Sequence, residues 1–171
     1  MVSVRTFVNI LAAAVCVIAV GVIIHMYWGD FLGTFSQDHA VYSIYVGNAA
    51  VEVTVADSDA ERVKGLSGVE HLDPRQGKLF IFDTDAKPGI WMKDMKFPLD
   101  IIWIDRDFKV VHIEENVSPD TYPQVFYPLV NARFVLEVNA QFVNTFKIKE
   151  GDTMDLPASL IPQDIRQNLR S

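Results

Sequence analysis

The chain has 171 residues, enough for one domain and an appendage. Its 22 acidic and 15 basic residues give a net charge of −7, which argues against binding to nucleic acid or to anionic lipid surfaces. The only cysteine, Cys16, lies near the N-terminus, so the rest of the chain contains no disulfide and must be held together by packing.

The first predicted element is a membrane helix, because the chain from Phe7 to Trp28 contains no Asp, Glu, Lys or Arg. About 20 apolar residues cross the bilayer core as a helix, and Tyr27 and Trp28 suit its aqueous interface. A cleaved signal peptide is the main alternative, but its apolar region is shorter and ends at a small-x-small site, which is missing here. Lipoprotein processing at Cys16 is disfavoured because Val15 precedes it. We therefore expect an uncleaved signal anchor.

The charges that flank this segment predict its orientation. Arg5 lies before it, whereas Asp30 and Asp38 follow it, which favours an N-terminus inside the cell. The protein is then a single-pass protein of the cytoplasmic (inner) membrane with its domain outside, in the periplasmic or extracellular space. The expected parts are the cytoplasmic N-terminus and anchor (1–30), a linker (31–40), a β domain (41–157) and a C-terminal tail (158–171), which we expect to be peripheral.

Alternating apolar residues predict β-strands through most of the remaining chain. Gly47-Asn48 predicts a hairpin between strands at 41–46 and 50–55. The stretch from Ser58 to Glu61 has the pattern of a capping box that opens a short helix ending near Gly65. Further strands are expected at 78–82, 91–95, 99–105, 108–113, 132–138 and 153–156, with a second short helix at 140–148. This series predicts a mainly-β fold, either a compact antiparallel β-sandwich or a partly open, jelly-roll-like barrel, with two short helices.

Residues 91–105, WMKDMKFPLDIIWID, form the most distinctive stretch, because it places five charges within apolar sequence. Together with Glu61-Arg62-x-x-Gly65-Leu66 and with Phe134–Val138 before Gly151-Asp152, it resembles the bacterial and archaeal family called domain of unknown function 192. The resemblance covers about residues 44–156 and implies a compact, often exported, β-sandwich-like domain with no established substrate, cofactor or partner. The family usually carries Asn where this chain has Asp94.

Asp94 and Asp100 are the first candidate site residues. In the strand at 99–105, Asp100 shares a face with Ile102 and Ile104, so it points toward the core. If residues 91–95 pair antiparallel with this strand, Asp94 opposes Asp100 with Cβ atoms about 5 Å apart. Two carboxylates at that distance share a proton, hold a cation or are bridged by a basic side chain. The alternative, which we favour, is that Asp100 accepts backbone hydrogen bonds and Asp94 points to solvent.

Trp91, Lys93 and Glu137 complete the predicted binding site. Trp91 can stack on a sugar or an aromatic ligand, although core packing is the commoner role of Trp in a strand. Lys93 lies beside Asp94, or is simply an exposed charge. Glu137 shares a strand face with Arg133, and an ion pair between the two is the default expectation.

The motifs of known enzymes are missing from the chain, which has no nucleophile motif, phosphate loop or dinucleotide fingerprint. The isolated His71 and His112 predict no metal site. We therefore expect a ligand-binding or accessory module with a cleft near Asp94 and Asp100 that takes a small polar ligand, a glycan or a cation. The alternatives are a hydrolase that uses paired carboxylates and a protein–protein interaction module of a membrane complex. The lipid bilayer, contacted through residues 7–28, is the other expected partner, and the sequence identifies neither a cofactor nor a protein partner.

Overall fold

The computed structural model of the chain describes residues 40–169. The predicted membrane helix at 7–28 and most of the predicted linker lie outside these residues. Within residues 40–169, no helix has both the length and the apolar character that a bilayer crossing requires. The anchor and the predicted division into four parts therefore stay predictions.

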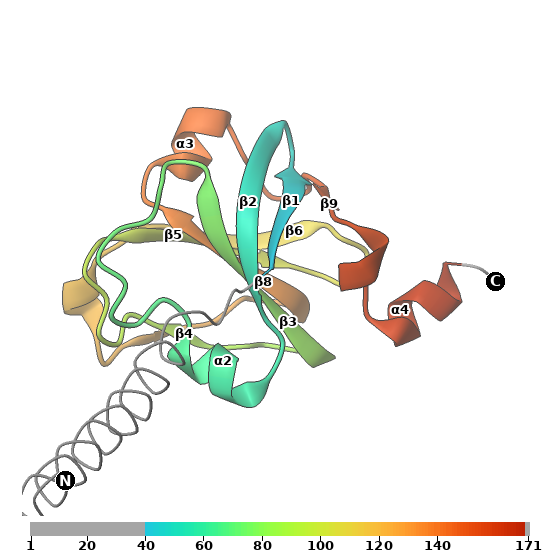
Figure 1. Cartoon of the computed structure of the whole chain (residues 1–171), viewed down its shortest axis with the longest axis horizontal. Helices are drawn as coiled ribbons and strands as arrows, with labels where there is room; N and C mark the ends of the chain where they lie inside the picture. The colour runs from blue at the N-terminus through green and yellow to red at the C-terminus, as the bar shows by residue number, and fades with distance from the viewer. Residues whose placement is uncertain (1–39, 170–171) are drawn as a thin grey trace, which may run out of the picture. The chain divides into compact units, whose positions relative to one another are not determined.

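Nine strands and several short helices make up the described part of the chain (Figure 1). The strands are β1 (Val41–Val46), β2 (Ala49–Ala56), β3 (Gln76–Ala86), β4 (Ile90–Trp91), β5 (Leu99–Ile104), β6 (Val110–Val117), β7 (Val125–Phe126), β8 (Ala132–Asn139) and β9 (Met154–Asp155). The α-helices are α2 (Asp59–Lys64), α3 (Phe142–Phe146) and α4 (Gln163–Asn168), and the 3-10 helices are η1 (Pro119–Thr121) and η2 (Ala158–Leu160). The mainly-β prediction is confirmed, with a third α-helix in the C-terminal tail.

Seven strands form one curled sheet in the order β6-β5-β8-β3-β2-β1-β9, and β4 pairs with β7 separately. All pairs in the sheet are antiparallel except β2 with β3, which are parallel. The sheet curls until its two edges meet at one end, where Lys109 bridges Thr153 and the Met154 N–H donates to the Phe108 carbonyl at 2.8 Å. The fold is therefore a half-barrel, nearer to the predicted partly open barrel than to a two-sheet sandwich.

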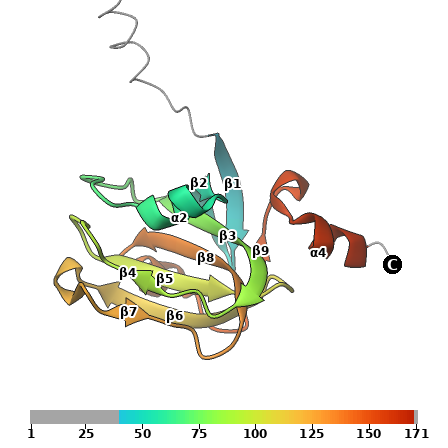
Figure 2. The ribbon, with the colours of Figure 1, turned by 90° about the horizontal axis from the view of Figure 1, so that it is seen from below.

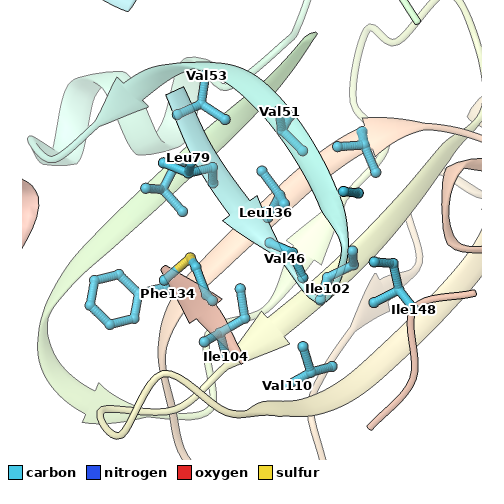
Figure 3. Close-up of a cluster of buried hydrophobic side chains, with 14 of the residues drawn as sticks. Val46, Val51, Val53, Leu79, Ile102, Ile104, Val110, Phe134, Leu136 and Ile148 are labelled. Atoms are coloured by element: carbon cyan, nitrogen blue, oxygen red, sulfur yellow. The ribbon is translucent and has the colours of Figure 1, made fainter. Parts of the chain in front are cut away.

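The inner, concave face of the sheet carries the larger of two hydrophobic cores (Figure 3). Nearly every strand contributes alternate residues to it, as a period of two requires. Members labelled in Figure 3 are Val46, Val51, Val53, Leu79, Ile102, Ile104, Val110, Phe134, Leu136 and Ile148. The predicted hairpin at Gly47-Asn48 is confirmed, and Gly47 has φ 55°, a conformation that glycine adopts without steric cost.

The outer face of the sheet carries the second core, which loops and short elements cover rather than strands. Its buried members are Ala56, Leu66, Phe80, Ile90, Met92, Met95, Leu99, Ile101, Trp103, Val117, Ala132 and Val135. The connection from β2 to β3 supplies part of this cover. Because β2 and β3 are parallel, the chain must cross back along the sheet between them, and α2 and residues 65–75 make that crossing.

Strand β5 confirms the predicted central strand, because all six of its residues are buried. Ile102 and Ile104 lie in the inner core, whereas Leu99, Ile101 and Trp103 lie in the outer core, so the predicted alternation is also confirmed.

The predicted hairpin between residues 91–95 and this strand is wrong. Both edges of β5 are already paired, with β6 on one side and β8 on the other. Only Ile90 and Trp91 are extended, and they pair with Phe126 and Val125 of β7. Asp94 then takes a positive φ of 55°, and a turn returns the Met95 N–H to the Met92 carbonyl at 3.3 Å. The next strand, β6, and the more distant β8 thus occupy both edges of β5, which leaves no edge for residues 91–95.

The C-terminal tail is not peripheral, contrary to expectation. Ile165 of α4 is 4% exposed and lies in the inner core. Beside it, the buried Arg133 of β8 donates a hydrogen bond to Asp164 at 2.7 Å. Apolar side chains, with Ile165 the most buried and Leu160 and Ile161 packed against the same core, and the ion pairs of Asp164 therefore attach the tail to the sheet.

Candidate functional site

An open groove of about 440 Å³ lies between helix α2 and strand β4, which Figures 1 and 2 show close together beside β3. Its walls are largely apolar and are formed by Val63 of α2, Phe80 and Phe82 of β3, and Ile90 and Trp91 of β4. An inner cavity of about 40 Å³ shares Phe80, Ile90 and Trp91 with the groove and extends beneath the C-terminal turn of α2. A wide, largely apolar groove and a narrow inner cavity are therefore adjacent and share part of their lining.

Glu137 of β8 lines this inner cavity. Its side chain faces the outer side of the sheet, opposite Ile101 of β5 and Lys78 of β3. Glu137 is only 5% exposed, and its Oε2 atom has no hydrogen-bond partner among residues 40–169. The cavity thus ends on a carboxyl group that the domain itself leaves incompletely bonded.

Burial raises the pKa of Glu137 to about 8, and the attraction of Lys78 offsets only part of this effect. The carboxyl is therefore mostly protonated at neutral pH, since burial without a full set of partners disfavours the charged form. Burial likewise lowers the pKa of Lys78, while the carboxylates of Glu61 and Glu137 act to raise it. The expected Arg133–Glu137 ion pair does not form, because Arg133 pairs with Asp85 and Asp164 instead.

Helix α2 is fixed over the cavity by the residues of the Glu61-Arg62-x-x-Gly65-Leu66 motif. The predicted capping box is confirmed: the Ser58 hydroxyl accepts from the Glu61 N–H, and the Glu61 carboxylate accepts from the Ser58 N–H. Gly65 ends the helix with φ 48°, where an added Cβ would lie 3.2 Å from a ring carbon of Phe80. Leu66 is buried in the outer core.

Arg62 attaches the same helix to β3. Its guanidinium donates to the carbonyl oxygens of Asp57 at 2.6 Å and Ile81 at 2.7 Å, and it also pairs with Asp59 at 2.7 Å and Asp83 at 3.1 Å. Asp59 and Asp83 line the groove, and their carboxylates already neutralise the charge of Arg62.

Trp91 lines the groove, and Lys93 lies beside its ring. Trp91 is 41% exposed rather than part of the core, and its ring contacts Tyr122 edge-on with the ring centroids 6.2 Å apart. The Lys93 Nζ atom lies 5.8 Å from the centre of the Trp91 ring, a cation–π distance. Residues 93 and 94 also hold the segment after α2, since the Lys93 carbonyl accepts from the Ser67 hydroxyl and the Asp94 carbonyl from the Gly68 N–H.

Asp100 accepts backbone hydrogen bonds and does not line the groove or its cavity. It is fully buried on the inner face, where Oδ1 accepts from the Asn116 N–H and Oδ2 from the Val143 N–H, both at 2.8 Å. These bonds join β5 to the end of β6 and to helix α3. Asp94 is exposed in its turn, so the two carboxylates do not form a cross-strand pair, and the alternative that we favoured is confirmed.

The structure therefore brings together Trp91, Lys93 and Glu137 of the predicted site residues, and it separates Asp100 from them. Sequence reasoning missed Lys78, although a charge at the start of the apolar strand 78–82 was visible. Within residues 40–169, no group of three or more His, Cys, Asp or Glu side chains is arranged to hold a metal ion. The site is thus an apolar groove that leads to a buried acid.

Comparison with known proteins identifies relatives of the described domain. Residues 43–156 match the family DUF192, described as "Uncharacterized ACR". No protein among the curated ones matches the chain.

Two solved structures are similar to the chain. One is a proposed transcription regulator from Sinorhizobium meliloti 1021, with 25% sequence identity and a TM-score of 0.67; the match covers 71% of this chain and 97% of that one. The other is a protein of unknown function from Novosphingobium aromaticivorans DSM 12444, with 25% identity and a TM-score of 0.65, covering 67% of this chain and 84% of that one.

Proposed function

The chain belongs to the uncharacterised family DUF192, and we propose that its domain is a binding module that takes a small organic ligand in the groove between α2 and β4. One observation carries this proposal: the buried Glu137, with an unpartnered carboxyl oxygen, lines a narrow cavity that adjoins an apolar groove. Leaving a buried polar atom unbonded costs about 1–3 kcal/mol. Apolar pockets with one or a few polar groups at fixed positions are typical of ligand sites.

Two other hollows of the domain have similar volumes. One, of about 420 Å³, is lined by the buried Arg133, whose Nε atom is also unpartnered within residues 40–169 but whose charge is balanced by ion pairs with Asp85 and Asp164. The other, of about 410 Å³, lies between residues 72–75 and helix α3 and has no buried charged side chain in its lining. Volume alone therefore does not distinguish the groove, whereas the adjoining cavity with a buried acid that forms no ion pair among the described residues does.

The test uses residues 40–171, because one solved relative consists almost entirely of the matching domain. A neutral probe, 2-phenylethanol, is added to isotopically labelled protein, and amide chemical shifts are followed by NMR. We expect saturable changes concentrated in residues 62–67, 89–91 and 137, which line the groove and its cavity. Changes spread equally over all three hollows would contradict a specific site.

A matched pair of variants sharpens this test. Val63 and Val130 are both exposed, but only Val63 lines the groove. Val63→Lys places a charge on the apolar wall and should weaken binding of the neutral probe, whereas Val130→Lys should not. Equal effects of the two substitutions would indicate non-specific binding.

We further propose that residues 7–28 hold this module at the outer side of the cytoplasmic membrane, as their apolar sequence and the flanking charges suggest. Alkaline extraction of membranes should leave the full-length protein in the pellet, and N-terminal sequencing should find the anchor still present. A mature N-terminus beyond residue 28 would contradict retention of the anchor.

The hydrolase alternative has lost its premise, because Asp94 and Asp100 are not paired. The alternative of a protein–protein interaction module stays a prediction.

A further inference from the structure

The walls of the inner cavity offer hydrogen-bond acceptors in excess of donors. Glu137 Oε2 is unpartnered, and the C-terminal turn of α2, from Arg62 to Gly65, lines the same space. The last carbonyl groups of a helix lack donors within the helix and carry partial negative charge. A ligand group that enters this cavity therefore meets acceptors first.

The donors that line the cavity are already engaged. The Ser67 hydroxyl donates to the Lys93 carbonyl at 2.8 Å. The terminal nitrogens of Arg62 donate to two backbone carbonyls and to the carboxylates of Asp59 and Asp83. A ligand that brings several donors would complete the hydrogen bonding of the site, whereas one that brings only acceptors could use no more than the single O–H of the neutral Glu137 carboxyl.

The charge around the groove also favours a cation. Asp59 and Asp83 flank its outer part, and Arg62 balances only one of these two carboxylates. Trp91 offers an aromatic ring that already accepts the Lys93 ammonium at cation–π distance.

Two lysines, Lys78 and Lys64, also lie near Glu137. Lys78 faces Glu137 from β3, where Glu61 of α2 attracts it as well. Lys64 lines the cavity from the exposed end of α2, where its ammonium can extend into water. Lys78 is buried but does not line the cavity, and Lys64 lines it from an exposed position, so neither lysine offers an anionic ligand a buried partner within the cavity.

We propose that the ligand of this groove is a primary amine carried on an apolar skeleton, with its ammonium group in the inner cavity against Glu137 and its skeleton along Phe82, Ile90 and Trp91. This inference rests on the proposed function and names the chemical class that the groove selects. The sizes agree. A water needs roughly 10–15 Å³ of such volume, so a cavity of about 40 Å³ admits a terminal methylene and its ammonium but not a ring. The skeleton must then remain in the wider groove.

Binding should release a proton. Before binding at pH 7, Glu137 is mostly the neutral acid, because burial raises its pKa to about 8. The arriving ammonium favours the carboxylate, so the carboxyl proton passes to the buffer while the amine keeps its own three protons. No covalent bond of the ligand forms or breaks. At pH 7, close to one proton should therefore leave for each amine bound, an order-of-magnitude expectation from the pKa.

The experiment compares three probes with the same aromatic skeleton: 2-phenylethylamine, 2-phenylethanol and phenylacetate. Each is titrated calorimetrically into residues 40–171 at pH 7, in buffers of different ionisation enthalpy, so that the proton count is measured directly. We expect the amine to bind about ten- to a hundredfold more tightly than the alcohol, with proton release for the amine alone. Phenylacetate should bind most weakly.

Two variants identify the group responsible. Glu137→Gln should weaken the amine by about tenfold or more, abolish its proton release and leave the alcohol nearly unchanged. The matched control Glu115→Gln changes an exposed glutamate of β6 that lines neither the groove nor its cavity, and should alter nothing. If alcohol or acid binds in the groove as tightly as the amine, or if Glu137→Gln leaves amine affinity unchanged, the amine inference is wrong while the binding site stands. If none of the three probes binds in the groove, the proposed function fails with it.

Discussion

Two buried carboxyl groups on neighbouring strands, Asp100 of β5 and Glu137 of β8, have opposite fates. Asp100 faces the inner core, and each of its oxygens accepts a backbone N–H at 2.8 Å. Glu137 faces the outer core, one of its oxygens lacks a partner, and a cavity lies beside it. The sequence places both in apolar strands with similar surroundings, so burial alone does not separate a structural acid from a candidate binding acid.

The difference comes from what covers each face. On the inner side, helix α3 and the end of β6 present free N–H groups to Asp100, which satisfies both oxygens. On the outer side, the cover is a helix end and a turn that line a cavity beside Glu137 and donate no hydrogen bond to its Oε2 atom. A buried carboxyl group therefore has hydrogen bonds to both oxygens in one layer and lacks a partner for one oxygen in the other. Hydrogen-bond satisfaction, rather than depth, marks the functional candidate.

The largest expected effect is the pH dependence of stability that Glu137 imposes. Its pKa is raised from 4.5 in the unfolded chain to about 8 in the folded domain. Between these values the unfolded chain binds fewer protons, so the free energy of unfolding falls as pH rises, by about 5 kcal/mol in total. Below pH 4.5 this effect disappears. Glu137→Gln should remove it, so the stability of the variant relative to the wild type should increase from pH 5 to pH 8 in urea unfolding.

Parallel stability curves for the two proteins over this range would contradict an uncompensated Glu137 and would remove the contrast with Asp100.

A smaller effect is expected from Asp100→Asn, compared with Asp94→Asn as its matched control. Asparagine at position 100 offers one acceptor instead of two and sets its NH₂ group against a buried N–H. We expect a loss of about 2–4 kcal/mol of unfolding free energy, since bonds to a charged group contribute about 1.5–3 kcal/mol. Asp94 is exposed, and asparagine tolerates its positive φ, so its substitution should change stability by less than about 0.5 kcal/mol. Urea unfolding measures both, and equal effects would sink the structural assignment of Asp100.

The smallest effect tests whether the cover of the outer face can loosen independently of the inner core. Ser58→Ala removes the capping box of α2 and should cost about 1 kcal/mol. Hydrogen exchange should speed up in residues 57–68 and leave the inner strands β1 and β2 unchanged. Ser159→Ala, at an exposed serine of η2, serves as the control. Faster exchange throughout the sheet would mean that the two layers form one cooperative unit.

Local patterns in the sequence predicted local structure well. The hairpin at Gly47-Asn48, the capping box at Ser58 and the face alternation around Asp100 depend on neighbours within a few residues, and all three are confirmed.

What failed depends on which strands meet across the fold. Trp91 pairs with Val125 of a distant segment. Glu137 lies opposite Lys78 and does not form the expected ion pair with Arg133. The register between strands far apart in the sequence decides such pairs, and no periodicity encodes it. The groove likewise forms where α2, which connects the parallel strands β2 and β3, lies beside β4. Its position could therefore not be predicted from Asp94 and Asp100.

The meeting of the two sheet edges at Lys109 and Thr153 bears on how copies of the protein behave toward one another. A strand edge with free N–H and C=O groups is a template on which another chain can pair and aggregate. Hydrogen bonds between residues 108–110 and 151–154 occupy one end of both edges. The remaining part of β6 carries Glu114 and Glu115, and charged side chains discourage such pairing. For a protein that the proposed anchor would concentrate in two dimensions, this arrangement keeps crowded copies from joining sheet to sheet.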